Sequence, residues 1–248
     1  MESNLRVHIS PVGFDPAGRV TGPLLEYRAD RVYLVSKSKS DSASDRMAQV
    51  RKTLEKHRHI EVHEVYVNIW DLFSCLEKLR EIFEKEKASH VFVNVSTGSK
   101  IVSIAGMIAC MLWRGTPYYA RLDYDGTGPS ASAASRQVVG TDLLPVYEIT
   151  KPTKQSLALL AIVAGAGGRM SKKQLIDRLE EARLIAPRQA SETKSAAHSR
   201  LRAILDPLES HWHFVEVSAS GRSSVVTLTE QGMSALRIFG GGSSAGPA

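Results

Sequence analysis

The chain has 248 residues, of which 43% are hydrophobic and 23% are charged. These values are typical of a globular protein and exclude disorder throughout, collagen and a fibrous coiled coil. The longest nearly apolar run, residues 101–113, is too short to cross a bilayer, and the first ten residues contain no apolar signal segment. Cys75 and Cys110 lie too far apart in sequence for a disulfide framework. We therefore expect a cytoplasmic protein with no membrane partner.

The charge is unevenly divided along the chain, whose formal net charge is +6. Residues 1–150 hold 19 Lys and Arg against 18 Asp and Glu, a net charge of +1. Residues 151–248 hold 13 Lys and Arg against 8 Asp and Glu, a net charge of +5. This excess in the C-terminal part favours a polyanionic partner there, and double-stranded DNA is the candidate.

The first 150 residues alternate extended and helical patterns. The apolar spacing at 71–83 and the apolar run at 101–113 predict two helices, and a sparser pattern near 47–54 predicts another. Residues 123–142 are rich in Gly, Ser and Ala and are expected to form a mobile loop before a last strand. Such alternation predicts an α/β domain with a mostly parallel, Rossmann-like sheet. The expected strands, rich in Val, Ile or Tyr, are residues 6–11, 31–35, 60–67, 90–95, 117–122 and 143–149.

Residues 151–239 are predicted to form a second, smaller domain. Helices are expected at 153–164, at 172–182 with Ser171 as the cap, and from about Ser191 onward. Two short strands, 214–217 and 224–228, follow, and three helices with a hairpin predict a winged helix-turn-helix. Residues 240–248 are expected to be a flexible tail. The third helix should bury one apolar stripe made of Ala197, Leu201, Ile204, Leu205 and Leu208.

In a winged helix the third helix enters the major groove and the wing lies along the phosphate backbone. Candidates on the third helix, opposite or beside the apolar stripe, are Lys194, Ser195, His198, Ser199 and Arg202. Candidates for phosphate contacts elsewhere are Lys172 and Lys173 at the start of the second helix and Arg222 in the wing. The alternative is a winged helix that contacts only protein, which the acidic Glu192 and Asp206 on the exposed face favour.

Residues 91–100, VFVNVSTGSK, lead from an apolar strand through small polar residues into a helix. Backbone N–H groups and a helix N-terminus at such a position favour an anion. The segment is not a Walker A loop, because Val93 stands where that motif requires its first glycine. The residues expected at this phosphate site are Ser96, Thr97, Gly98, Ser99 and Lys100.

The stretch Asn94–Lys100 is similar to the Asn-x-Thr-Gly-Gly-Thr-Lys type signature of CARF domains, the CRISPR-associated Rossmann fold. Pro11–Asp15 fits the first ligand loop of that family, whereas Ser99 replaces the second glycine or threonine common in the signature. A CARF domain followed by a winged helix would cover essentially the whole chain, and this layout resembles that of CRISPR-associated transcriptional regulators. It implies a homodimer with no cofactor that binds a cyclic oligoadenylate, in the first place cyclic tetra-adenylate, on its two-fold axis.

A parallel sheet binds its ligand outside the carboxyl ends of its strands. Three loops should converge there, and they supply the candidates Gly13, Phe14 and Asp15, then Ser36, Lys37 and Ser38, then residues 96–100. The lysines would neutralise phosphates, Phe14 would stack on a base, and Asp15 would accept from a ribose or an adenine amine. The alternative for Lys37, Lys39 and the serines beside them is a solvated loop.

Three functions follow from these features. The first is a ligand-responsive DNA-binding regulator. The second is a metal-independent ring nuclease that cleaves the cyclic ligand with Ser96, Ser99 and Lys100, and the third is a CARF domain that only dimerises a constitutive DNA-binding module. The spacing of Arg51 and His57 matches a ribonuclease pattern that arises often by chance. No metal site is expected, because no carboxylate or cysteine completes a tetrahedral set with the histidines of residues 57–63.

Overall fold

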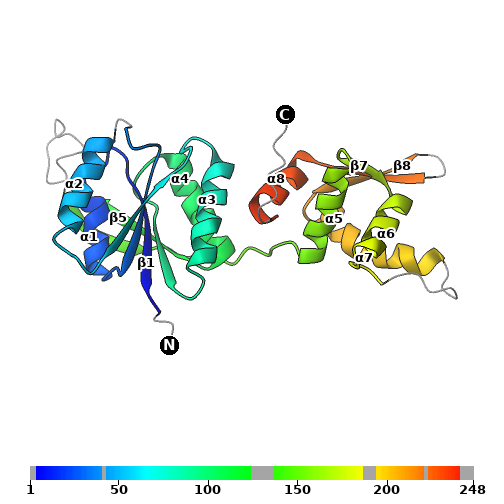
Figure 1. The fold of residues 1–248 in the computed structure, drawn as a ribbon, viewed down its shortest axis with the longest axis horizontal. Helices are drawn as coiled ribbons and strands as arrows, with labels where there is room; N and C mark the ends of the chain where they lie inside the picture. Colours follow the sequence, from blue (N-terminus) through cyan, green and yellow to red (C-terminus); the bar gives the residue numbers. More distant parts are fainter. Residues whose placement is uncertain (1–3, 41–42, 124–136, 187–193, 221–222, 241–248) are drawn as a thin grey trace. The chain divides into compact units, whose positions relative to one another are not determined.

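The computed structural model describes residues 4–40, 43–123, 137–186, 194–220 and 223–240. The chain divides into two compact units, Met1–Thr150 and Lys151–Ala248. Figure 1 shows the helices and strands of both units. Within the described residues, no helix is both long and apolar enough to cross a membrane.

The N-terminal unit is built on one six-stranded sheet with the order β3-β2-β1-β4-β5-β6. The first five strands run parallel, and β6 pairs antiparallel with β5. This arrangement confirms the predicted Rossmann-like α/β fold. The strands are β1 (Arg6–Pro11), β2 (Arg31–Ser36), β3 (Glu61–Tyr66), β4 (His90–Asn94), β5 (Thr116–Leu122) and β6 (Val138–Leu143).

Helices cover both faces of this sheet, as Figure 1 shows. The helices α1 (Gly18–Glu26) and α2 (Ser44–Leu54) lie on one face, and α3 (Leu72–Lys85) and α4 (Lys100–Trp113) pack together on the other. Asp71 caps α3 by accepting from two backbone N–H groups, and Ser99 caps α4 by accepting from the N–H of Val102. Each capping residue therefore sets where a helix starts at the carboxyl edge of the sheet.

Two local expectations were wrong. The last strand was expected at 143–149, but β6 begins at Val138, inside the expected loop, and the chain leaves the sheet after Leu143. Pairing with β5 decides this position, which alternation of residue types did not show. The helix α1 was not predicted; it contains two glycines and Pro23, and it forms by burying Val20 and Leu24 against the sheet. Of the expected loop, residues 124–136 lie outside the described residues.

The C-terminal unit contains the predicted helices and hairpin. Ser171 caps α6 in a capping box with Gln174, which confirms the predicted start of that helix. Gly167 and Gly168 lead into a short strand that was not predicted and that pairs with the hairpin strand β9. The elements are α5 (Lys154–Gly165), β7 (Arg169–Ser171), α6 (Lys172–Glu181), α7 (Lys194–Ser210), β8 (Val215–Ser220), β9 (Ser223–Leu228) and α8 (Glu230–Phe239).

The core of this unit lies between the helices and the sheet β7-β9-β8. The predicted stripe on α7 is buried, because its five residues are each at most 7% exposed. They pack with apolar residues of α5 and α6 and with Val215 and Val226 of the hairpin. The fold is therefore the winged helix that the sequence predicts, and the opposite face of α7 remains at the surface.

Candidate ligand site and nucleic-acid surface

The loops after β1, β2 and β4 leave the same edge of the sheet, because these three strands are parallel neighbours. Phe14 is 70% exposed in the first loop. Lys37 and Ser38 are exposed in the second loop, whereas Ser36 is buried at the end of β2. Lys100 is exposed at the start of α4. The structure thus places exposed lysines and an exposed aromatic ring at one rim.

The loop after β4 is held closely against the end of β1. Gly98 has a φ of +81°, and a Cβ there would lie 2.6 Å from the Cβ of Pro11. A Cβ on Gly13 would lie 3.0 Å from the Cα of Gly98. The hydroxyl of Thr97 donates to the carbonyl of Pro11 at 2.6 Å. Only glycine fits at position 98, because other residues rarely adopt so positive a φ and because any Cβ would collide with Pro11.

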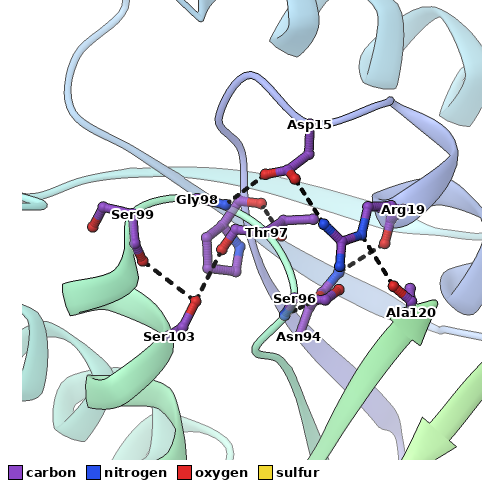
Figure 2. A network of polar contacts seen from close by, with 10 residues as sticks. Asp15, Arg19, Asn94, Ser96, Thr97, Gly98, Ser99, Ser103 and Ala120 are labelled. Atoms are coloured by element: carbon purple, nitrogen blue, oxygen red, sulfur yellow. Dashed lines mark hydrogen bonds and ion pairs between the residues drawn. The ribbon is translucent and has the colours of Figure 1, made fainter. Parts of the chain in front are cut away.

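Asp15 and Arg19 tie the same loop to β5 (Figure 2). One oxygen of Asp15 accepts from Arg19 at 2.8 Å, and the other accepts from the N–H of Gly98 at 3.2 Å. The buried Arg19 also donates to the carbonyl of Ala120 at 3.0 Å. Each carboxylate oxygen of Asp15 thus accepts one hydrogen bond from the protein, which gives Asp15 a positioning role in the loop, and its expected contact with a ribose or an adenine amine stays a prediction.

Asn94 completes this network from the end of β4. Its amide nitrogen donates to the carbonyl of Arg19 at 2.8 Å, and its amide oxygen accepts from the N–H and the hydroxyl of Ser96 at 2.9 and 2.6 Å. Ser96 is 9% exposed and Thr97 is 1% exposed, so both hydroxyls point into the protein. These two residues shape the loop, while Gly98, Ser99 and Lys100 form its outer part.

Ser99 links the loop to the end of β3. Its hydroxyl donates to the carbonyl of Ile69 at 2.7 Å and accepts from the N–H of Val102 at 3.2 Å. The next residue after Ile69 is Trp70, whose side chain is 67% exposed. Trp70 was not among the predicted site residues, although it follows a strand of the same parallel sheet, whose carboxyl ends lie at one edge.

A cavity of about 620 Å³ adjoins this rim between α2 and the ends of β2 and β3. Ser36 and Ser38 line it together with residues that were not predicted, including Lys39, Arg51 and Glu64. Arg51 forms an ion pair with Glu64 at 2.7 Å, so these two charges compensate each other. The cavity extends the polar rim toward α2.

A buried polar cluster lies in the sheet below the rim. The hydroxyl of Tyr118 lies 3.2 Å from that of Ser10 and 3.4 Å from Nδ1 of His8. Burial lowers the pKa of His8 to about 3 and raises the pKa of Tyr118. Both side chains are therefore neutral at physiological pH, and they link β1 to β5 across the intervening strand β4.

On the C-terminal unit, the structure brings four of the predicted DNA-binding residues together. A cavity of about 200 Å³ is lined by Lys172 of α6 and by His198, Ser199 and Arg202 of α7, with leucine side chains beneath them. Lys173 is exposed on α6, and Asp206 is exposed further along α7. Lys194 and Ser195 occupy the first turn of α7, while Arg222 and Glu192 lie outside the described residues.

In the part of the chain that the structure describes, no three His, Cys, Asp or Glu side chains are grouped so that they would hold a metal ion. His63 instead lies 2.7 Å from a carboxylate oxygen of Glu61 and stacks on Tyr33. His57 and His59 contact each other edge to face.

Two family models match the chain, one in each unit. Residues 6–124 match the model described as HFX_2341_N:-like, N-terminal, and residues 155–240 match WHD_DUF6293, the DUF6293 C-terminal winged helix domain. Among curated proteins, none matches this sequence.

Solved structures with a similar fold include Csm6 of Enterococcus italicus bound to cyclic hexa-2'-fluoro-hexa-dAMP, at 12% identity and a TM-score of 0.45. The alignment covers 84% of this chain and 56% of that one. Can2 of Sulfobacillus thermosulfidooxidans in complex with cyclic tetra-adenylate has 13% identity, coverages of 95% and 64%, and a TM-score of 0.41. The protein VC1899 of Vibrio cholerae has 12% identity, coverages of 94% and 64%, and a TM-score of 0.40. The chain thus spans less than two thirds of each of these structures.

The fold and the rim define a class of protein, namely a Rossmann-like α/β domain with a glycine-centred loop at its carboxyl edge, joined to a winged helix domain. Within that class, the N-terminal domain resembles the family described as HFX_2341_N:-like, N-terminal, and the C-terminal domain resembles the DUF6293 C-terminal winged helix domain.

Proposed function

We propose that this protein is a transcriptional regulator that binds a cyclic oligoadenylate through its N-terminal domain and DNA through its C-terminal domain. The observation that carries the proposal is the loop Gly98–Lys100, which three elements hold in place and which leads directly into α4. The similarity of Asn94–Lys100 to the CARF signature indicates that the anion bound there is a cyclic oligoadenylate.

The physical chemistry of the rim suits a phosphate group. The first N–H groups of a helix have no partner within the helix, and the helix dipole adds positive partial charge there. The exposed side chain of Lys100 begins α4, and the exposed Lys37 lies on the loop after the second strand. A phosphate at this position would therefore meet backbone donors and two cations.

We propose that two copies of the chain meet along α4. This helix is apolar on all sides, and Ile104 on its outer face is 50% exposed. Since α4 begins at the loop that would bind phosphate, a two-fold axis along this helix would bring two such loops together. Light scattering should report a dimer for the wild type and a monomer for Ile104→Glu, because a buried charge would be unpaired in that interface.

The C-terminal unit would contact DNA through the surface that contains Lys172, His198 and Arg202. A phosphate or base-edge contact by Arg202 would explain why this arginine lies exposed beside a lysine on the outer face of α7. The acidic Asp206 lies one turn further along the helix, so the contact surface should be confined to the first half of α7.

Fluorescence anisotropy with labelled duplex DNA tests the DNA-binding part of the proposal. At low salt the wild type should bind a random duplex, and Arg202→Ala should weaken this binding by about tenfold. Arg237→Ala, on the exposed side of α8 in the same unit, is the matched control and should leave binding unchanged. If the wild-type protein binds no duplex at low salt, the proposed function as a transcriptional regulator is refuted.

Calorimetric titration with cyclic tetra-adenylate and cyclic hexa-adenylate tests the ligand. Lys100→Ala should weaken binding by about 10- to 150-fold, as expected for loss of one charge-assisted hydrogen bond. Lys87→Ala, an exposed lysine between α3 and β4 at the opposite edge of the sheet, should bind as the wild type does. Ligand should also change the affinity for DNA, and DNA should change the affinity for ligand by the same factor.

The ring nuclease is the competing function for the same rim. The hydroxyls of Ser96 and Ser99, its expected catalytic groups, are engaged with Asn94 and Ile69, which supports binding without cleavage. Cyclic tetra-adenylate incubated with the protein should therefore elute unchanged in chromatography. Appearance of linear products that disappears in Lys100→Ala would support the nuclease instead.

A further inference from the structure

Trp70 is the most exposed tryptophan of the described residues, and its exposure has no structural explanation within the N-terminal unit. It is 67% exposed, in the short connection between β3 and α3. An exposed indole loses the free energy that burial of its large apolar surface would contribute. An exposed aromatic ring on a well-held loop is therefore a candidate for a ligand contact.

The backbone around Trp70 is fixed on both sides. Its N–H donates to the side-chain oxygen of Asn68 at 3.2 Å, and the carbonyl of Asn68 accepts from the N–H of Asp71 at 3.1 Å. Asp71 in turn caps α3. The preceding residue, Ile69, accepts from the hydroxyl of Ser99 at 2.7 Å. Trp70 thus projects from a turn that is bonded directly to the proposed phosphate loop.

Phe14 lies in a second segment that is bonded to that loop. It is 70% exposed, and its neighbour Asp15 accepts from the N–H of Gly98 at 3.2 Å. Gly98 and Ser99 are adjacent in sequence, so the segments that carry Phe14 and Trp70 each contact the same two-residue stretch. Two exposed aromatic residues therefore lie in segments that are bonded to the loop at the N-terminus of α4.

We propose that Trp70 stacks on a purine base of the bound nucleotide and, together with Phe14, determines the preference of the site for adenine over pyrimidine bases. The inference rests on the proposed nucleotide-binding function and assigns the base recognition that the phosphate loop does not provide. The loop and Lys100 read only phosphate, which every nucleotide contains, whereas a large aromatic face gains more from a purine than from a pyrimidine.

Fluorescence provides a direct test, because the chain has three tryptophans. In the variant Trp113→Phe/Trp212→Phe, Trp70 is the only remaining indole. Saturating cyclic tetra-adenylate should quench its emission by about half or more, because a stacked base lies against the indole face. Emission that does not change while calorimetry reports full binding would overturn the stacking.

Affinities of substituted full-length chains complete the test. Trp70→Ala should bind cyclic tetra-adenylate about 10- to 100-fold more weakly, as expected for the loss of one stacked base, and Trp70→Phe should stay within about fivefold of the wild type. Cyclic tetra-uridylate should bind weakly to both the wild type and Trp70→Ala. Tyr147→Ala is the control, because Tyr147 is 76% exposed but lies near Ile149, which bonds to the far end of α4 at Met111.

The outcomes separate this inference from the proposed function. If Lys100→Ala weakens binding while Trp70→Ala binds normally, the nucleotide site stands and the role of Trp70 is refuted. If Trp70→Ala binds normally but is a monomer in light scattering, the indole contacts a second copy of the chain, and the stacking is likewise refuted. If the wild type binds neither cyclic tetra-adenylate nor cyclic hexa-adenylate, both the function and the inference fail.

Discussion

The close approach of Gly98 to β1 leads to a quantitative prediction for the substitution Gly98→Ala. Alanine at a φ of +81° costs about 1–2 kcal/mol, because the left-handed region crowds its Cβ against the backbone. The same Cβ would lie 2.6 Å from the Cβ of Pro11, and relieving such an overlap costs about 1–3 kcal/mol. Gly98→Ala should therefore lower the free energy of unfolding of the N-terminal unit by about 2–5 kcal/mol.

Gly167 offers a matched control for the conformational part of this cost. Its φ is +80°, and no atom lies within 4 Å of where its Cβ would be placed. Gly167→Ala should therefore lower the free energy of unfolding of the C-terminal unit by only about 1–2 kcal/mol. The difference between the two substitutions measures the contact with Pro11.

Urea unfolding followed by tryptophan fluorescence measures both quantities. In a Trp212→Phe background, the fluorescence of Trp70 and Trp113 reports the unfolding of the N-terminal unit. In a Trp70→Phe/Trp113→Phe background, the fluorescence of Trp212 reports the unfolding of the C-terminal unit. Equal losses from Gly98→Ala and Gly167→Ala would refute the reasoning, because the close packing of the loop on β1 would then contribute nothing. Gly98→Ala should also weaken binding of cyclic tetra-adenylate, since the loop would have to move away from β1.

Three further predictions concern the N-terminal unit. Glu86 is 3% exposed and accepts two hydrogen bonds from Arg31, so Glu86→Gln should lower the free energy of unfolding, measured in urea, by about 3 kcal/mol. Glu61 is a half-exposed partner of the same arginine, and Glu61→Gln should lower it by under about 1 kcal/mol. Equal losses from the two substitutions would contradict the role of burial. Burial lowers the pKa of His8 to about 3 in the folded protein, whereas its pKa in the unfolded chain is 6.5. Between these two values only the unfolded chain takes up the proton. The free energy of unfolding should therefore fall as the pH falls, by about 1.4 kcal/mol per pH unit between pH 6.5 and 4.5. His8→Phe should remove that component of the slope, and an unchanged slope would show that other groups cause it. Burial raises the pKa of Cys75 to about 11 and that of Cys110 to about 12. Both thiols should therefore react slowly with a disulfide reagent at pH 8 in the folded protein and rapidly in urea. Fast reaction of the folded protein would contradict this prediction.

Much of the fold could be predicted because its signals are local. The strand predicted at residues 6–11 is found at Arg6–Pro11, since the β-branched Val7 and Ile9 recur at a period of two, which is visible in a short window. The start of α6 at Ser171 was predicted from its capping residue for the same reason. The winged helix followed from the spacing of apolar residues on α7, whose buried stripe the structure confirms.

The misplaced strand and the missed helix have a different cause. The position of β6 depends on its pairing with β5, and α1 forms against its local propensity because burial of Leu24 and Val20 outweighs the cost of Pro23 within it. Neither effect is visible in a window of neighbouring residues. Tertiary packing overrides local preference at both places.

For the candidate site, residue order alone determined that small polar residues follow β4 and that a helix begins after them, because strand, loop and helix are contiguous in the chain. Only the tertiary structure decided which of these groups point inward and which outward. Asp15 meets Gly98 across 83 positions of sequence, and Ser99 meets Ile69 across 30. Such contacts arise from the order of strands in the sheet, so the inward role of Asp15 and the exposed position of Trp70 became visible only when the chain was folded.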